Sequence, residues 1–284
     1  MKWVNISTDT GTKAGLVSEG EVRLTHAGDV FELLSDLDEA RARAGEAGSV
    51  AFDPARLHAP ILRPRKILGI GLNYAAHVKE SVSFIKNTAP EVQKWFNKQA
   101  TAANGPYASV NVPAVSEQLD YEAEIVAIIG KTGRHVPEDR ALELVAGYCC
   151  GCDYSVRDWQ RASQTMIMGK GFDTHAPFGP YLVTPDEIED FDVLEVCSYV
   201  NGERRQQGFA RDMIFSISQQ IAHLTAAFTL EPGDVIFTGT PAGVGAGFDP
   251  PKWLKPGDQV RIEVTGLGHI QNEIAEEKKV TVLR

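Results

Sequence analysis

The sequence predicts a mixed α+β fold in which β-structure dominates and helices are few. Two observations lead to this expectation. Short runs with the composition of β-strands recur between turns rich in Gly, Pro and Asp, at residues 195–201, 234–238, 259–264 and 279–283. The regular alternation of strands and helices that is typical of a doubly wound parallel sheet does not occur. We therefore expect largely antiparallel or mixed sheets.

The first 60 residues are expected to form a small N-terminal domain. Three short alternating runs predict strands, at residues 3–7, 15–18 and 22–24. One polar, Ala-rich segment, residues 31–45, predicts a helix. The segment 59–65 has the proline content of a linker, and an apolar strand is expected directly after it at residues 66–72. We place the boundary near residue 60, so that the catalytic domain would comprise residues 61–284.

The composition of the chain argues against some classes of partner and location. The 284 residues include 28 Lys and Arg against 38 Asp and Glu, a net charge of −10, which argues against nucleic acid or an anionic membrane as partner. No run of 18 apolar residues and no signal-peptide pattern occurs, so we expect a soluble cytoplasmic protein. The cysteines crowd into one apolar segment and predict buried core residues rather than disulfides or a zinc site; they are Cys149, Cys150, Cys152 and Cys197.

The most informative segment is residues 121–130, an apolar strand with two carboxylates at its beginning. Side chains on a strand alternate between its faces, so Glu122 and Glu124 point the same way, with Cα atoms about 6 to 7 Å apart. A hard cation such as Mg²⁺ or Mn²⁺ can bridge that distance and compensate both charges. The alternative for an isolated Glu-x-Glu is a strand edge that faces solvent.

A third carboxylate favours the metal. Asp153 follows a second apolar segment, residues 144–150, and precedes a helix that we expect to begin at Ser155, with Asp158 completing a capping box. If the two strands are neighbours, three carboxylates converge on one point. Three oxygen ligands with positions left for water and substrate describe an open catalytic metal site.

A second group of candidate residues follows the strand at 66–72. Asn73 is expected to cap a helix on which His77 and Glu80, three residues apart, share one face. A carboxylate beside an imidazole orients the ring and raises its basicity, so the pair could activate water as a general base. The alternative is an ordinary surface pair. The stretch 83–99 could close over such a site as a lid.

Other polar residues could contact a substrate. Lys170 stands between two glycines and could bind a carboxylate or an enolate oxygen, and Gln160 could donate a hydrogen bond to the same oxygen. Both residue types are more often simply exposed. The segment 239–247 is too rich in glycine for a helix and predicts a loop whose backbone can approach a ligand closely.

Five separated motifs agree in order with one family. They are Gly-Leu-Asn-Tyr-x-x-His-x-x-Glu at 71–80, Asp-Tyr-Glu-x-Glu at 120–124, Asp-x-Ser-x-Arg-Asp-x-Gln at 153–160, Gly-Lys-x-Phe-Asp-Thr at 169–174 and Gly-Thr-Pro-x-Gly-Val-Gly at 239–245. With these motifs the chain from about residue 64 to its end resembles the fumarylacetoacetate hydrolase family. The resemblance implies a β-roll of mixed sheets with a small N-terminal domain, and a homodimer.

The resemblance also implies roles for residues within the motifs. Mg²⁺ or Mn²⁺ would be held by three carboxylates, those of Glu122, Glu124 and Asp153. His77 and Glu80 would form a water-activating dyad on a helix that becomes ordered when substrate binds, with Lys170 as the third catalytic residue. The substrate would be contacted by the side chains of Lys170, Gln160, Thr240, Arg157 and Tyr74.

The activity that these residues imply is hydrolysis of a carbon–carbon bond in a small anionic oxo acid. The substrate would be a 2,4-dioxo acid, such as an acylpyruvate, a fumarylacetoacetate-like acid or a diketo-deoxy sugar acid, and the products pyruvate and a carboxylic acid. Decarboxylation of oxaloacetate, or isomerisation of a 2-hydroxymuconate-type acid, would use the same metal and enolate chemistry. A metal-stabilised binding protein without catalysis is the third alternative.

Overall fold

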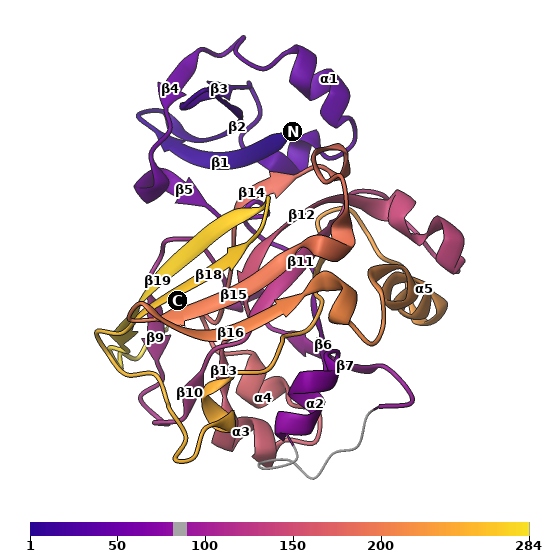
Figure 1. The fold of residues 1–284 in the computed structure, drawn as a ribbon. Helices are drawn as coiled ribbons and strands as arrows, with labels where there is room; N and C mark the ends of the chain where they lie inside the picture. The colour runs from indigo at the N-terminus through magenta and orange to yellow at the C-terminus, as the bar shows by residue number, and fades with distance from the viewer. Residues whose placement is uncertain (82–89, 284) are drawn as a thin grey trace.

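The computed structural model describes residues 1–81 and 90–283 and confirms a mixed α+β fold (Figure 1). Twelve strands of the described chain form one large sheet: β1 (Lys2–Thr8), β2 (Gly11–Ser18), β3 (Glu21–Leu24), β4 (Ser49–Ala51), β5 (Leu57–His58), β6 (Ile67–Gly71), β7 (Lys94–Lys98), β8 (Ala103–Asn104), β11 (Ala123–Ile129), β12 (Val145–Cys152), β14 (Ala176–Val183) and β17 (Val235–Phe237). Most pairs are antiparallel, whereas β17 runs parallel to β6 and β14 parallel to β8, so the sheet is mixed.

Two smaller sheets complete the β-structure of the described residues. A five-stranded sheet has the order β16 (Glu203–Phe209), β15 (Glu195–Val200), β18 (Gln259–Val264), β19 (Gly268–Glu276) and β9 (Val110–Val112). A two-stranded sheet joins β10 (Leu119–Asp120) to β13 (Ser155–Val156). In Figure 1 the yellow and orange strands of the five-stranded sheet lie in front of β11 and β12, and this layering encloses the main core.

The N-terminal strands continue the large sheet. Strand β1 pairs with β14, with Trp3 opposite Leu182, so the order runs from β4 through β1 into the central strands. Trp3 is fully buried and belongs to the same apolar cluster as Val126 and Ile128 of β11. The boundary near residue 60 stays a prediction, although the strands before it and after it share one sheet.

Strand β11 is buried on both faces, which explains why all of its residues after Glu124 are apolar. Ile125 and Ala127 point toward the five-stranded sheet, whereas Val126 and Ile128 point toward the cluster that contains Trp3. Burying one such isoleucine or valine side chain stabilises the fold by about 1.5 to 3 kcal/mol. All four cysteines are buried, as expected.

Helices are few and short in the described parts of the chain. The α-helices are α1 (Leu37–Ala42), α2 (Ala75–Ser81), α3 (Arg157–Ala162), α4 (Ile167–Lys170) and α5 (Ile217–Ala227). The 3-10 helices are η1 (Val30–Leu33), η2 (Pro54–Arg56), η3 (Ala100–Ala102), η4 (Glu138–Leu144), η5 (Pro185–Glu187), η6 (Phe191–Val193), η7 (Ala210–Asp212) and η8 (Gly245–Gly247). None of the helices described has the length and apolarity needed to cross a membrane.

Three sequence predictions about elements need correction. The single helix expected at 31–45 is two short helices, η1 and α1, because the Asp36 side chain accepts a hydrogen bond from the Glu39 N–H and begins a new helix. The strand expected at 279–283 is wrong. Residues 279–283 pair with no described strand, and Val280 and Leu283 are exposed, since the last strand of the sheet ends at Glu276.

The third correction concerns the segment 83–99. Its last part is β7, which pairs antiparallel with β6, so that residues 94–98 extend the large sheet instead of forming a separate lid. Phe96 and Lys98 alternate with exposed neighbours and are buried, as the period of a strand requires. The part of the expected lid at 83–89 lies outside the described residues.

Candidate active site

The three predicted metal-binding carboxylates lie together at the point where β11 begins and β12 ends. These strands are antiparallel with Ala123 opposite Cys152, and the Asp153 N–H donates to the Glu122 carbonyl at 2.9 Å. Each of Glu122, Glu124 and Asp153 therefore offers a carboxylate oxygen to one point, and these oxygens lie within 4.8 Å of one another. All three side chains are buried. The convergence predicted from strand period and pairing is confirmed.

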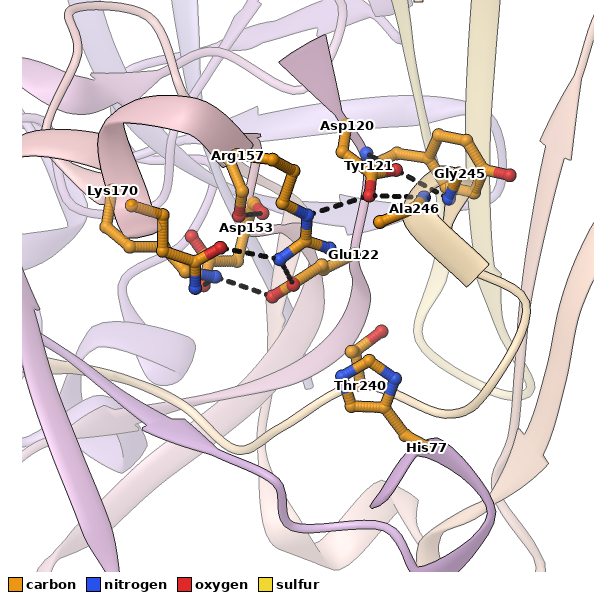
Figure 2. A network of polar contacts seen from close by, with 12 residues as sticks. His77, Asp120, Tyr121, Glu122, Asp153, Arg157, Lys170, Thr240, Gly245 and Ala246 are labelled. Carbon is orange, nitrogen blue, oxygen red and sulfur yellow. Dashed lines mark hydrogen bonds and ion pairs between the residues drawn. The ribbon is translucent and has the colours of Figure 1, made fainter. Parts of the chain in front are cut away.

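Three buried cations surround this cluster, and Figure 2 shows two of them, Lys170 and Arg157. Lys170 Nζ lies 2.6 Å from Glu122 Oε2 and 2.5 Å from Asp153 Oδ2. Lys98 Nζ lies 2.5 Å from the other oxygen of Asp153, and Arg157 Nη1 lies 2.7 Å from Glu122 Oε1. Burial alone would raise the pKa of Glu122, but Lys170 and Arg157 outweigh it and lower that pKa below its usual range. Glu122 is thereby held ionised.

Glu124 is the carboxylate without a cation. Among the described residues no Lys or Arg forms an ion pair with it, and its Oε2 accepts from the Gly239 N–H at 2.7 Å. Burial, and then Asp153 and Glu122, raise the pKa of Glu124 well above its usual range. A buried carboxylate in this position is stabilised by added positive charge.

The donor set fits a small hard divalent cation. Mg²⁺ binds oxygen ligands at about 2.1 Å, so opposite ligands of an octahedron lie about 4 Å apart, close to the separation of the three carboxylates. Ionised Glu124 would lack a paired cation, and a divalent ion would supply the positive charge that its ionised form needs. Glu122, Glu124 and Asp153 are accordingly the residues that would hold Mg²⁺ or Mn²⁺.

The expected dyad is formed on α2. His77 Nδ1 lies 3.0 Å from Glu80 Oε2, and both side chains are largely buried. Because an ionised carboxylate can only accept, Nδ1 carries the proton and Nε2 keeps its lone pair. His77 lines the same cavity as Glu122 and Glu124. Figure 2 shows its ring on the side of that cluster where Thr240 lies.

The glycine-rich loop at 239–247 binds the protein's own carboxylates. The N–H of Gly239 donates to Glu124, and that of Gly243 donates to Glu80 Oε1 at 2.9 Å. The N–H groups of Gly245 and Ala246 donate to the two oxygens of Asp120 at 2.6 and 2.9 Å (Figure 2). One loop thus joins the dyad to the acidic cluster through its backbone.

Two residues of the site have no role in the sequence prediction. Asp120 is fully buried and accepts from Arg157 Nε at 2.8 Å as well as from the loop, so it holds Arg157 against Glu122. Its position in the Asp-Tyr-Glu-x-Glu motif is the sequence feature that could have identified Asp120 as part of the site. Lys98 lies within the segment expected to be a lid. Its burial beside Asp153 depends on the pairing of β7 with β6, which no local pattern indicates.

The predicted substrate-binding residues do not all line the cavity. A cavity of about 470 Å³ is lined by four of them, Arg157, Gln160, Lys170 and Thr240. Tyr74 is not among the lining residues: it is buried, and its hydroxyl has no hydrogen-bond partner among the described residues. Burial, with Glu124 and Asp212 nearby, raises the pKa of Tyr74.

Two predicted helix caps are wrong, for reasons of tertiary structure. Ser155 pairs with Asp120 in the two-stranded sheet, so α3 begins two residues later at Arg157 and no capping box forms. Asn73 does not cap α2. Its amide donates to the carbonyls of Phe215 and Thr238, and its Oδ1 accepts from the Phe215 N–H, so it fixes the chain before α2 to two distant segments.

The fold and the acidic site together define a class of protein. Residues 66–275 match the family model described as fumarylacetoacetate (FAA) hydrolase C-terminal. The chain therefore belongs to the fumarylacetoacetate hydrolase family, as the motifs predict.

Individual relatives carry several names. The chain is 41% identical over 236 residues to human oxaloacetate tautomerase FAHD2A, mitochondrial, covering 82% of this chain and 74% of that protein. It resembles the crystal structure of 5-carboxymethyl-2-hydroxymuconate delta-isomerase from Mycobacterium smegmatis, with 30% identity and a TM-score of 0.78. It also resembles maleylpyruvate hydrolase from Sphingobium sp. SYK-6, solved with manganese(II) and pyruvate, with 28% identity and a TM-score of 0.80. Both structural matches cover 98% of this chain and all of the other.

Proposed function

We propose that the protein is a hydrolase that uses Mg²⁺ or Mn²⁺ to cleave the carbon–carbon bond of a 2,4-dioxo acid. The observation that carries the proposal is that His77, whose Nδ1 is bound to Glu80, lines one cavity together with the carboxylates Glu122 and Glu124. A base that faces a metal site can deliver water to a carbonyl group held there. The related hydrolase solved with manganese(II) and pyruvate supports both the metal and the product.

The buried cluster supplies the electrostatic part of the chemistry. A divalent ion held by Glu122, Glu124 and Asp153 would act as a Lewis acid toward the 2-oxo acid end of the substrate. Lys170 and Arg157, which also line the cavity, add positive charge beside the carbonyl oxygens. Gln160 accepts from Arg157 Nη1 at 2.9 Å through Oε1, and its Nε2 donates to Met166 Sδ at 3.7 Å, so its amide group is held in one orientation at the cavity wall.

His77 acts as the base in the hydrolytic step. Its Nε2 takes a proton from water, and the water oxygen bonds to C4 of the dioxo acid. The C3–C4 bond then breaks, its electron pair passes to the C2 oxygen as an enolate, and C4 leaves as a carboxylic acid. The proton on His77 returns to C3 and gives pyruvate. Glu80 keeps the ring in the required tautomer and stabilises the imidazolium.

Tautomerisation of oxaloacetate is the second candidate. The 41% identity to human oxaloacetate tautomerase FAHD2A favours it. The reaction needs only proton movement between C3 and the C2 oxygen, which His77 could perform without activating water. The name of the related delta-isomerase describes another reaction without hydrolysis. Decarboxylation of oxaloacetate would use the same residues.

Turnover of a panel of substrates separates these candidates. Purified protein with Mg²⁺ or Mn²⁺ is given acylpyruvates and enol-oxaloacetate, and the products are identified by NMR. Pyruvate plus a carboxylic acid supports hydrolysis. If the protein speeds the ketonisation of oxaloacetate and cleaves no acylpyruvate, the hydrolase is rejected in favour of the tautomerase. If it forms pyruvate and CO₂ from oxaloacetate alone, the hydrolase is rejected in favour of the decarboxylase. His77→Ala is expected to lower hydrolysis at least about 100-fold while Mn²⁺ still binds.

A further inference from the structure

The cavity has a positively charged rim that the reaction described above does not use. Lys94 on β7 and Arg161 on α3 both line the cavity, and both are exposed, whereas Glu122, Glu124 and Lys170 are buried at its inner end. In Figure 1 both β7 and α3 lie in the lower half of the molecule, as does α2 with the dyad. The cavity therefore has its carboxylates, with buried cations beside them, at the inner end and two exposed cations at the rim.

The two rim cations differ from the inner ones in their partners. Lys98, Arg157 and Lys170 each form ion pairs of 2.5 to 2.8 Å with buried carboxylates. In the part of the chain that the structure describes, the Lys94 side chain forms no hydrogen bond or ion pair. Arg161 donates to the neutral Gln118 Oε1 at 2.6 Å, and no described carboxylate pairs with it. Two positive charges at the rim are thus left uncompensated.

The helix α3 relates the rim to the interior. Arg157 and Arg161 are four residues apart on α3, so they lie on the same side of the helix, separated by a rise of about 6 Å. The inner arginine is bound to Asp120 and Glu122, and the outer one is open to an anion. A ligand held at the metal site by one end would present its other end to Arg161 and Lys94.

We propose that Lys94 and Arg161 form a subsite for a second carboxylate, so that the substrate is a dicarboxylic oxo acid whose acyl end is ionised. The subsite rests on the proposed function for the location of the 2-oxo acid end. Guanidinium and ammonium groups bind carboxylates through charge-assisted hydrogen bonds. In a protein with a net charge of −10, an uncompensated basic rim also attracts a dianion to the cavity. An acyl group ending in a methyl group or an aromatic ring offers neither cation a carboxylate.

Binding of two matched ligands tests the subsite without requiring turnover. Calorimetry of the Mg²⁺-loaded protein compares 2-oxoglutarate with its 5-methyl ester, which keeps the 2-oxo acid end and removes only the distal charge. Wild type is expected to bind 2-oxoglutarate at least tenfold more tightly than the ester. The double variant Lys94→Met with Arg161→Gln is expected to bind the two ligands within about twofold of each other.

A charge-matched control separates the subsite from the overall field. Lys131→Met with Arg140→Gln changes the net charge by the same amount at exposed positions outside the cavity, and this double variant keeps the wild-type preference. Equal affinity of wild type for the two ligands, or no binding of either, overturns the subsite. A preference that persists in the Lys94 and Arg161 double variant overturns the assignment to these residues.

The outcomes also separate this subsite from the proposed reaction. Discrimination of the two ligands by a protein that cleaves no acylpyruvate would keep the subsite and reject the hydrolase. Hydrolysis of acylpyruvates with equal kcat/KM for ionised and esterified acyl ends would keep the hydrolase and reject the subsite.

Discussion

Arg157 donates from Nε to Asp120 Oδ2 at 2.8 Å, and this buried pair connects the acidic cluster to the glycine-rich loop. The two oxygens of Asp120 accept from four donors, the guanidinium and the N–H groups of Tyr121, Gly245 and Ala246. Arg157 in turn reaches Glu122, a predicted metal ligand. Loss of this pair would therefore affect both the stability of the fold and the arrangement of the site.

Asp120→Asn is expected to destabilise the protein by about 3 to 5 kcal/mol, since it removes one of the two carboxylates that pair with the buried Arg157 and turns an amide NH₂ toward backbone donors. Urea unfolding at pH 7 measures the change. Glu143→Gln removes the carboxylate of an exposed ion pair with Arg140 and is the matched control, with nearly unchanged unfolding. Equal midpoints for the two variants would contradict the role given to Asp120.

Gly247→Ala is expected to inactivate the enzyme while sparing the metal site. A Cβ at Gly247 would lie 2.2 Å from Glu80 Oε1, so the Glu80 carboxylate must leave the position in which it is bound to His77. Loss of an oriented base lowers kcat by a factor of about 100 or more. Mn²⁺ affinity, measured by calorimetry, should stay within about twofold of wild type. Gly105→Ala, where the nearest atom is 3.5 Å from the added Cβ, is the control for an added methyl group.

Mg²⁺ or Mn²⁺ should stabilise the wild-type protein and not Glu124→Gln. Ligand at 100 times its Kd adds about 2.7 kcal/mol to the free energy of unfolding. The glutamine side chain can still accept from the Gly239 N–H, but the substitution removes the one carboxylate of the cluster that lacks a cation. Thermal unfolding with added metal and with EDTA measures both proteins. A metal-dependent shift of equal size in the variant would exclude Glu124 as a ligand.

Acid should destabilise the protein through His175. Burial lowers the pKa of His175 to about 3, while its Nε2 contacts the Asn111 carbonyl at 2.8 Å. Between pH 6.5 and 3 the unfolded chain binds a proton that the folded chain excludes, so stability falls as the pH falls. From pH 7 to pH 5 this group contributes a loss of about 2 kcal/mol.

Urea unfolding of His175→Gln at both pH values measures this contribution. Glutamine keeps a donor for the Asn111 carbonyl and does not titrate, so the variant should lose about 2 kcal/mol less than wild type between pH 7 and pH 5. His223→Gln, at an exposed position of α5, is the control and should keep the wild-type difference. The same loss in all three proteins would assign the acid sensitivity to other groups.

Local patterns were sufficient for the parts of the site that lie close together in the chain. The strand period places Glu122 and Glu124 on one side, and the helix period brings His77 to Glu80. The pairing of consecutive apolar strands then adds Asp153, and the family motifs predict the mixed fold. These contacts follow from local backbone geometry, which is determined by residues that are close together in the chain.

Contacts between distant segments were decided by the tertiary structure. Lys98 reaches Asp153 only because β7 pairs with β6, and Ser155 is in a strand because it pairs with Asp120. The loop N–H groups find carboxylates more than 100 residues away, and every backbone amide is an equally good donor, so no residue type marks these pairs. Residues 279–283 have the composition of a strand, but a strand also needs a partner, and among the described residues the fold provides none for them.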